Sequence, residues 1–143
     1  MLDTLTDSKR YVFVYGTLRK GEVRDINRLL PAPAFIGNSQ INGTLYHLGS
    51  YPGVRLGGLN WVQGEVYQIT PELERQLDEI EEVWPQQSGE YVKREVVVEV
   101  EVVVVVQSAR QALTCLVYEV TEARIPGRAV IESGDWVKQG TTT

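Results

Sequence analysis

The sequence has very few of the residues on which covalent, redox and soft-metal chemistry depends. Its 143 residues include one cysteine, Cys115, and one histidine, His47. A single cysteine excludes an intramolecular disulfide, and with it the framework of a small secreted domain. A zinc-type site would have to be built mostly from carboxylates, and their spacing does not indicate one. We therefore expect a cytoplasmic protein without a metal or cofactor, in which both residues are structural.

An excess of basic residues and a long uninterrupted apolar segment are also missing. Fourteen Lys and Arg residues face nineteen Asp and Glu residues, a formal net charge of −5, which argues against binding to nucleic acid or to an anionic membrane. The first ten residues are polar and lack the apolar segment of a signal peptide. The run from Val96 to Val106 contains Glu99 and Glu101 and is too short to span a bilayer. The expected partner is a small molecule, and the sequence does not indicate an oligomeric state.

The length and composition are typical of one globular domain. The hydrophobic fraction of 43% and the charged fraction of 23% are ordinary values, and a chain of this length can bury one core. We expect flexible ends at 1–9 and 139–143 around a single domain at 10–138. Short β-rich runs separated by glycine and proline dominate that domain, so the predicted fold class is α+β, mostly β.

Runs of β-branched and aromatic residues predict where the strands lie. The predicted strands are residues 11–15, 35–48 (one strand or two, with a turn or bulge at Asn42-Gly43), 61–69, 91–107 and 112–120. Residues 49–60 are rich in turn-forming residues, and SARQ at 108–111 is the expected hairpin turn. Every even position from Val96 to Val106 is valine, the alternation of a strand with one buried face.

Two segments predict helices. Residues 22–30 place four apolar side chains at helical spacing and are followed by prolines. Thr70 and Pro71 begin the second helix, because threonine suits the N-cap and proline suits the first helical position. This helix carries ELERQLDEIEE, residues 72–82.

The second helix ends with four carboxylates in six residues, LDEIEE at 77–82. At about 100° per residue, the core-facing stripe consists of Leu73, Leu77 and Ile80. The acids predicted to face solvent are Asp78, Glu79 and Glu82. Glu81 lies on the shoulder of the apolar stripe, closer to it than any other acid. Glu74 comes next, but it lies in the first turn, where a negative charge simply suits the helix dipole.

Two interpretations of Glu81 follow from this position. Partial burial, the neighbouring carboxylates and the helix C-terminus all raise the pKa of a carboxyl group, as a general base working near neutral pH requires. Alternatively, Glu81 is a boundary residue whose stem packs while its carboxylate reaches water. The helical positions alone favour this second, more common case.

A glycine-containing loop, YGTLRKG at 15–21, follows the first predicted strand. Such a loop can direct several backbone N–H groups toward one point and form an anion or oxyanion site. Its spacing matches neither the dinucleotide-binding fingerprint nor the Walker A motif. Glycines after strands are more often plain turns, so the loop alone does not identify a site.

The segment VFVYGTLRKG at 12–21 resembles the opening of the γ-glutamylcyclotransferase-like superfamily, in its bacterial AIG2-like and γ-glutamylamine branch. Further segments resemble the same family in the same order: LYHLGSYPGV at 45–54, GEVYQI at 64–69, LDEIE at 77–81, Tyr91 with Arg94, VY at 117–118 and IESGDW at 131–136. No single segment is decisive, but together they cover most of the chain. The resemblance implies a small mixed β-barrel with a few short helices.

The resemblance also implies an activity, the cyclisation of the γ-glutamyl group of an amine or amino acid to 5-oxoproline with release of the free amine. The nucleophile is the substrate's own α-amino group, which suits a chain without a nucleophile–histidine pair. Glu81, the last residue of the family's L-D-x-x-E motif, is the implied catalytic acid and base. The implied substrate-binding residues are Tyr15, Gly16, Thr17, Leu18, Arg19, Tyr91 and Tyr118. Glu82 departs from the family, which usually has glycine there, and this bears on the substrate.

Several alternatives remain open at this stage. Tyr91 and Tyr118 suit either a pocket or a sheet in which each hydroxyl is bonded. Arg19 and Arg94 suit a contact with the substrate α-carboxylate or, more commonly, surface ion pairs. Trp136 suits a lid over the core. The whole chain also suits a non-catalytic module that binds a small ligand on the same fold, or a structural β-domain.

Overall fold

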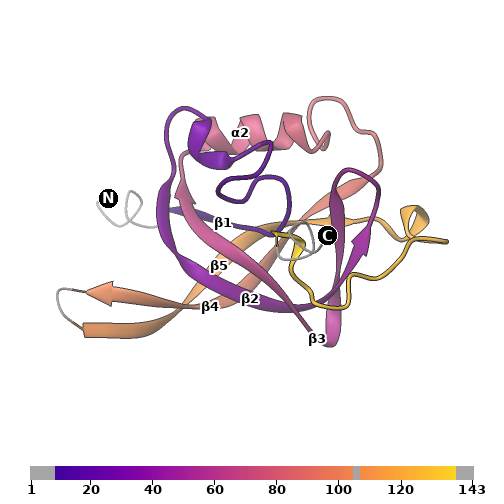
Figure 1. The fold of residues 1–143 in the computed structure, drawn as a ribbon. Coiled ribbons are helices and arrows are strands. Elements are labelled where there is room, and N and C mark those ends of the chain that lie inside the picture. Colours follow the sequence, from indigo (N-terminus) through magenta and orange to yellow (C-terminus); the bar gives the residue numbers. More distant parts are fainter. Residues whose placement is uncertain (1–8, 105–106, 138–143) are drawn as a thin grey trace.

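The computed structural model describes residues 9–104 and 107–137. The expected flexible ends therefore lie outside the described residues, apart from Lys9. Figure 1 shows a strongly curved sheet with one helix lying across it. In chain order the elements are β1 (Arg10–Val14), the 3₁₀ helix η1 (Ile26–Arg28), β2 (Ala34–His47), β3 (Pro52–Ile69), α2 (Pro71–Ile80), β4 (Tyr91–Val104), β5 (Gln107–Val120) and the 3₁₀ helix η2 (Glu122–Arg124).

The sheet is mixed and has the strand order β2-β3-β1-β5-β4. Strand β1 runs antiparallel to β3 and parallel to β5, and beyond the end of β1 a further pairing joins Val54 of β3 to Glu119 of β5. The α+β class is confirmed. The expected barrel is wrong, because within the described residues no ladder joins the outer strands β2 and β4. The sheet curves but stays open.

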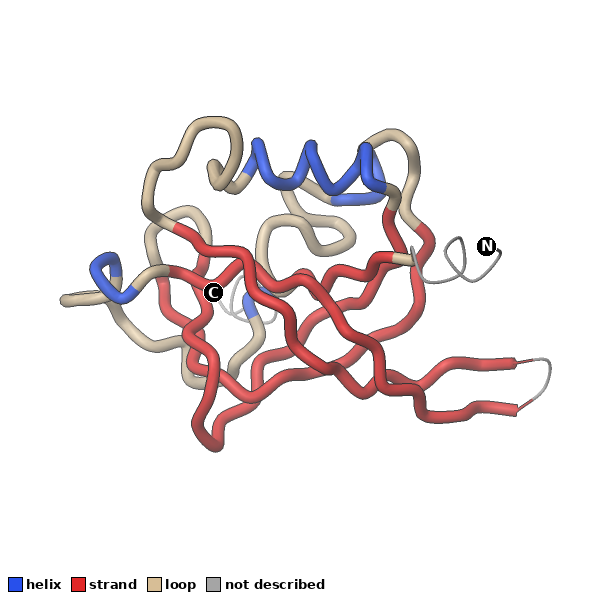
Figure 2. The backbone as a smooth tube through the Cα atoms, turned by 180° about the vertical axis from the view of Figure 1, so that it is seen from behind, coloured by secondary structure: helices blue, strands red, loops and turns tan. Residues whose placement is uncertain are grey.

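The core divides at the sheet into two clusters. Because side chains alternate along a strand, Val12 of β1 packs in one cluster and Phe13 packs in the other. Helix α2 buries Leu73 and Leu77 in the first cluster. Figure 2 shows the loop that follows β1 lying between this helix and the strands. The helix and the loop are thereby held on the same side of the sheet.

Helix α2 begins and ends with defined capping contacts. The predicted N-cap is confirmed: the Thr70 hydroxyl accepts a hydrogen bond from the Leu73 N–H at 3.1 Å, and Pro71 is the first helical residue. At the other end, the Val83 N–H donates to the Asp78 carbonyl at 2.9 Å and the Glu82 N–H donates to the Glu79 carbonyl at 3.1 Å. This is the Schellman pattern, and it turns the chain directly after Glu81.

Three local predictions are wrong. The helix expected at 22–30 is only the short η1, because Val23 and Leu30 are each 75% exposed and give a longer helix no apolar face to bury. Residues 49–60 do not remain turns throughout, since β3 begins at Pro52. SARQ at 108–111 belongs to β5, where Arg110 pairs with Glu101 of β4. The hairpin connection falls at residues 105–106, outside the described residues.

Two other local predictions are confirmed. Residues 35–48 form most of one strand, and its register with β3 shifts at Asn42/Gly43, as a bulge does. Val98 and Val100 are buried while Val97 is exposed, which is the predicted alternation. The valines predicted to continue this pattern from 102 to 106 lie outside the side chains that the structure describes.

Candidate active site

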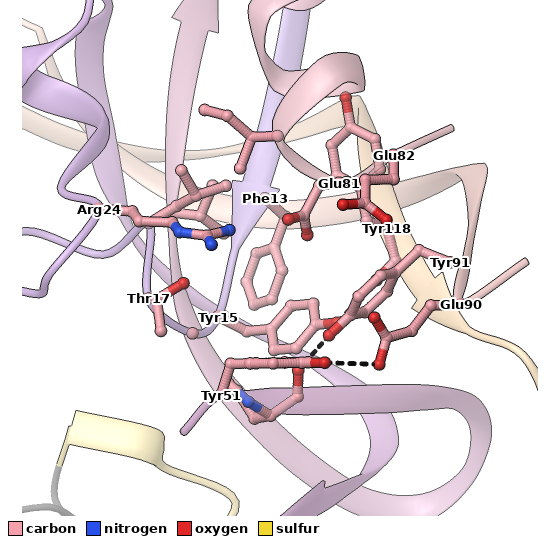
Figure 3. A pocket seen from close by; sticks show the side chains of 15 residues that line it. Phe13, Tyr15, Thr17, Arg24, Tyr51, Glu81, Glu82, Glu90, Tyr91 and Tyr118 are labelled. Atoms are coloured by element: carbon pink, nitrogen blue, oxygen red, sulfur yellow. Dashed lines mark hydrogen bonds between the residues drawn. The ribbon is translucent and has the colours of Figure 1, made fainter. Parts of the chain in front are cut away.

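A cavity of about 120 Å³ opens where the loop after β1, the end of α2 and the starts of β3 and β4 meet. Figure 3 shows the side chains that line it. Its polar lining consists of three carboxylates, one guanidinium group, one threonine and four tyrosines: Glu81, Glu82, Glu90, Arg24, Thr17, Tyr15, Tyr51, Tyr91 and Tyr118. A concave pocket with a few converging polar groups is the usual form of a small-molecule site.

Glu81 is the C-cap residue of α2 and lines this cavity. Its backbone N–H still donates to the Leu77 carbonyl at 2.9 Å, so the helix fixes its position. Its carboxylate accepts no hydrogen bond from the residues that the structure describes. The pKa of Glu81 is raised to about 7: burial is the largest cause, the charge of Arg24 acts in the opposite direction, and the charges of Glu90 and Glu82 add to the increase. The carboxyl group therefore titrates near neutral pH and has no partner in the part of the chain that the structure describes.

The loop after β1 lines the same cavity with Gly16, Thr17 and Leu18. Gly16 packs against Pro52 so closely that a Cβ atom at position 16 would lie 2.6 Å from the proline Cγ, which only glycine avoids. Among the described residues, no hydrogen-bond acceptor is found for the backbone N–H groups of Gly16, Thr17 and Leu18. Successive backbone donors in residues that line a pocket can hold a carbonyl oxygen or an oxyanion.

The rings of Tyr15, Tyr91 and Tyr118 line the cavity, and their hydroxyls are all engaged by the fold. Tyr15 donates to the Tyr118 carbonyl at 2.7 Å, and Tyr91 donates to the Pro52 carbonyl at 2.7 Å. Tyr118 donates to the Asp78 carboxylate at 2.7 Å. Burial raises the pKa of each hydroxyl, so all three stay neutral. Both alternatives left open for Tyr91 and Tyr118 are thus true at once.

Asp78 does not face solvent, contrary to the prediction. It is 8% exposed, accepts the Tyr118 hydroxyl and pairs with Lys93 Nζ at 2.9 Å. Glu74, the other candidate on this helix, pairs with Arg10 at 3.0 Å and with Lys93 at 2.7 Å. The Arg10 guanidinium, which donates to the Glu74 carboxylate, holds the pKa of Glu74 below its usual range. Both acids tie α2 to the sheet.

Arg19 does not line the cavity. Its Nε donates to Glu65 at 3.1 Å and its guanidinium pairs with Asp135 at 2.9 Å. The buried Glu65 carboxylate also accepts the Lys20 N–H at 3.0 Å and the Tyr67 hydroxyl at 2.8 Å. These contacts fasten the far side of the loop to β3, so Arg19 holds the loop from outside.

The other residues considered in the sequence also lie outside the cavity lining. Arg94 pairs with Glu119 at 3.0 Å. The ring of Trp136 contacts that of His47 in a tilted arrangement, with 5.4 Å between centroids, and its indole N–H donates to Glu22 at 3.0 Å. Cys115 is buried in the core, consistent with a structural role.

Sequence reasoning missed three residues of the polar lining, Arg24, Tyr51 and Glu90. Tyr51 lies within LYHLGSYPGV, one of the quoted segments, but nothing there distinguished it from its neighbours. Arg24 follows the loop in a segment that was expected to be helical. Glu90 lies in the loop before β4. These positions become neighbours only when distant segments fold together.

The family model described as "Gamma-glutamyl cyclotransferase, AIG2-like" matches residues 12–138. The chain belongs to this family. It is 39% identical over 80 residues to a Vibrio cholerae protein that carries the name γ-glutamylcyclotransferase, covering 50% of this chain and 62% of that one. It is 38% identical over 72 residues to the γ-L-glutamyl-butirosin B γ-glutamyl cyclotransferase of Niallia circulans, covering 50% of this chain and 45% of that one. Each match spans less than two thirds of the relative.

One solved structure is similar over nearly the whole chain. The solution structure of protein ytfP from Escherichia coli is 27% identical, with a TM-score of 0.62, and the match covers 91% of this chain and 98% of that one. Among the residues that the structure describes, there is no group of His, Cys, Asp and Glu that could hold a metal ion. The described part of the chain also has no helix long and apolar enough to cross a membrane.

Proposed function

We propose that the protein is a cyclotransferase that converts a γ-glutamyl amine or γ-glutamyl amino acid into 5-oxoproline and the free amine. The observation that carries this proposal is the position of Glu81: a carboxylate without a partner among the described residues, whose pKa is about 7, in a cavity that Gly16, Thr17 and Leu18 also line. The backbone N–H groups of these three residues have no acceptor in the described part of the chain. Membership of the γ-glutamyl cyclotransferase family supports the same reaction.

In the proposed reaction the ionised Glu81 takes a proton from the substrate α-ammonium group. The freed α-nitrogen attacks the γ-carbonyl carbon and closes a five-membered ring. The bond from that carbon to the amide nitrogen then breaks, and protonated Glu81 gives its proton to the leaving nitrogen. The carboxylate regenerated in this way takes the second proton from the ring nitrogen and passes it to the released amine or to solvent. The products are 5-oxoproline and an amine, and the reaction consumes no water and no redox equivalent.

In this proposal the loop after β1 stabilises the oxyanion, and the tyrosine rings orient the substrate. The N–H groups of Gly16, Thr17 and Leu18 stabilise negative charge on the γ-carbonyl oxygen as the ring closes. The rings of Tyr15, Tyr91 and Tyr118 enclose the glutamyl chain and hold it folded, with its nitrogen against its own carbonyl. Because the donors are already free and the rings are already fixed, little has to reorganise when substrate binds.

The deciding test is Glu81→Gln, measured as 5-oxoproline release from a panel of γ-glutamyl amines and γ-glutamyl dipeptides. General acid–base catalysis contributes about 10²–10⁴-fold to a rate, so we expect kcat to fall by at least about a hundredfold. Glu79→Gln is the matched control: it lies on the same helical turn but is exposed and outside the cavity, so its activity stays at the wild-type level. Absence of 5-oxoproline with wild type, or full activity in Glu81→Gln, contradicts the proposal.

A further inference from the structure

The charges around the cavity are unevenly placed. Among the described residues that line it, Arg24 is the single cationic side chain, whereas Glu82 and Glu90 join Glu81 in supplying carboxylates. Figure 3 shows Arg24 on one side of Glu81 and Glu90 on the other, with Glu82 on the Glu90 side. The cavity therefore has a cationic end and an anionic end, with the proposed base between them.

The carboxylates of the anionic end have free oxygens. Tyr51 donates its hydroxyl to Glu90 Oε2 at 2.7 Å, which orients the carboxylate. Glu90 Oε1 accepts no hydrogen bond within the described part of the chain, and neither oxygen of Glu82 has a hydrogen-bond or ion-pair partner there. The nearby guanidinium groups of Arg124 and Arg128 lie outside the lining and donate instead to the carbonyls of Ser88 and Leu48.

The proposed reaction fixes which end of the substrate meets which end of the cavity. The α-ammonium group must lie at Glu81, and the α-carboxylate is attached to the same carbon atom. That carboxylate is favoured at Arg24 and disfavoured at Glu82 and Glu90. The scissile amide and the departing amine then extend toward the two glutamates.

We infer, given the proposed cyclotransferase function, that Glu82 and Glu90 select γ-glutamyl amides whose leaving group carries a second, positively charged amine. The substrate class is that of γ-glutamylated diamines and polyamines. A carboxylate on the leaving group meets two like charges, and a neutral alkyl group leaves both glutamates without a partner. Arg24 takes the α-carboxylate, which every γ-glutamyl substrate has in common.

Three substrates whose leaving groups have similar lengths test this inference: γ-glutamyl conjugates of 1,4-diaminobutane, of butylamine and of 4-aminobutyrate. Their leaving groups are cationic, neutral and anionic. We expect kcat/KM for 5-oxoproline formation to fall in that order, by about tenfold per step at low salt, and the differences to shrink as ionic strength rises. Equal values for the three, or the reverse order, overturn the inference while the cyclotransferase function stands. If neither these three conjugates nor any other γ-glutamyl amide releases 5-oxoproline, the function itself is overturned.

Variants separate the two ends of the cavity. Glu90→Gln keeps an oxygen for the Tyr51 hydroxyl, and with Glu82→Gln it should reduce the preference for the cationic leaving group over the neutral one to near unity. Glu132→Gln, an exposed carboxylate outside the cavity, should keep the full preference. Arg24→Gln should raise KM for all three substrates alike. An unchanged preference in the Glu82 and Glu90 double variant, or a changed preference in Arg24→Gln, overturns the assignment.

Discussion

At the scale of single residues, the pKa of Glu81 depends first on burial and then on the charges around its carboxyl group. The pKa is raised to about 7: burial contributes most, the Arg24 cation lowers the pKa, and the Glu90 and Glu82 anions raise it. A general base acts only when ionised, so kcat/KM should rise about tenfold per pH unit below pH 7 and level off above it. The measurement is a pH–rate profile between pH 5 and pH 8.5, with a substrate concentration well below KM.

Single substitutions should move this profile in opposite directions. Arg24→Gln removes a cation and should shift the rising limb to higher pH, whereas Glu90→Gln removes an anion and should shift it to lower pH. Glu79→Gln, exposed on the same turn, should leave the limb in place. If the rising limb of the pH–rate profile lay near pH 4.5, or if neither Arg24→Gln nor Glu90→Gln moved it, a group other than Glu81 would be the one that titrates.

The same residues show what the sequence could predict at this scale. Helical spacing placed Glu81 at the edge of the core, and the structure finds it partly buried. The same reasoning assigned Asp78 to solvent. Helical spacing gives the direction in which a side chain points, but it does not show which strand packs against the helix in that direction. Lys93 and Tyr118 lie there and bury Asp78. Arg24 had no pattern of its own, since it reaches the cavity through contacts between segments distant in sequence.

At the scale of elements, the end of α2 is strained at one residue. Glu82 has a φ of 57°, in the left-handed region where the Schellman motif usually has glycine. A left-handed conformation costs a non-glycine residue about 1–2 kcal/mol. Glu82→Gly should therefore raise the free energy of unfolding by about 1 kcal/mol, measured by urea denaturation at neutral pH.

Glu82→Ala is the control for this prediction. It removes the same charge beside Glu81 but keeps a Cβ atom, so the strain remains. The difference between the glycine and alanine variants isolates the backbone term. Equal stability of the two would contradict the strain, because only the charge would then have mattered.

Elements defined by local signals were predictable, and those defined by distant partners were not. Thr70, Pro71 and the apolar stripe were sufficient for α2, since caps and spacing act within one or two turns. The valine alternation was sufficient for part of β4. Residues 108–111 look like a turn but pair with β4, because a long hairpin partner outweighs weak local preference. The apolar residues at 22–30 likewise lacked the partner surface that a helix needs.

At the scale of the whole molecule, the site lies where the sheet, α2 and the loop after β1 converge, and ion pairs hold that arrangement. Arg10 of β1 and Lys93 of β4 both contact Glu74 of α2, while Arg19 and Glu65 fasten the loop to β3. Sequence patterns predicted the α+β class but not that the sheet stays open. Closure into a barrel depends on whether the edge strands β2 and β4 pair with each other, and local sequence patterns do not predict such a pairing.

The raised pKa of Glu81 should lower the free energy of unfolding of the whole molecule at neutral pH. The pKa of Glu81 is about 7 when folded against 4.5 as its ordinary value, so as pH rises the unfolded chain ionises first. Folding stability therefore falls as pH rises from about 4.5 to about 7, and is constant above that range. Glu81→Gln removes this loss. Allowing for partial exposure and for the unpaired amide, we expect it to stabilise the protein by about 1–2 kcal/mol at pH 8 and by almost nothing at pH 4.5.

Urea unfolding of wild type, Glu81→Gln and Glu79→Gln at a series of pH values from 4.5 to 8 measures this effect. The gap between wild type and Glu81→Gln should open over the same pH range in which catalytic activity rises, whereas Glu79→Gln should show no pH-dependent gap. A gap that is constant with pH would mean that Glu81 has the same pKa in the folded and unfolded chain, and would remove the basis for its role near neutral pH. The stability gap and the catalytic activity should therefore change over the same pH range, because the ionisation of Glu81 that permits catalysis is the one that the fold disfavours.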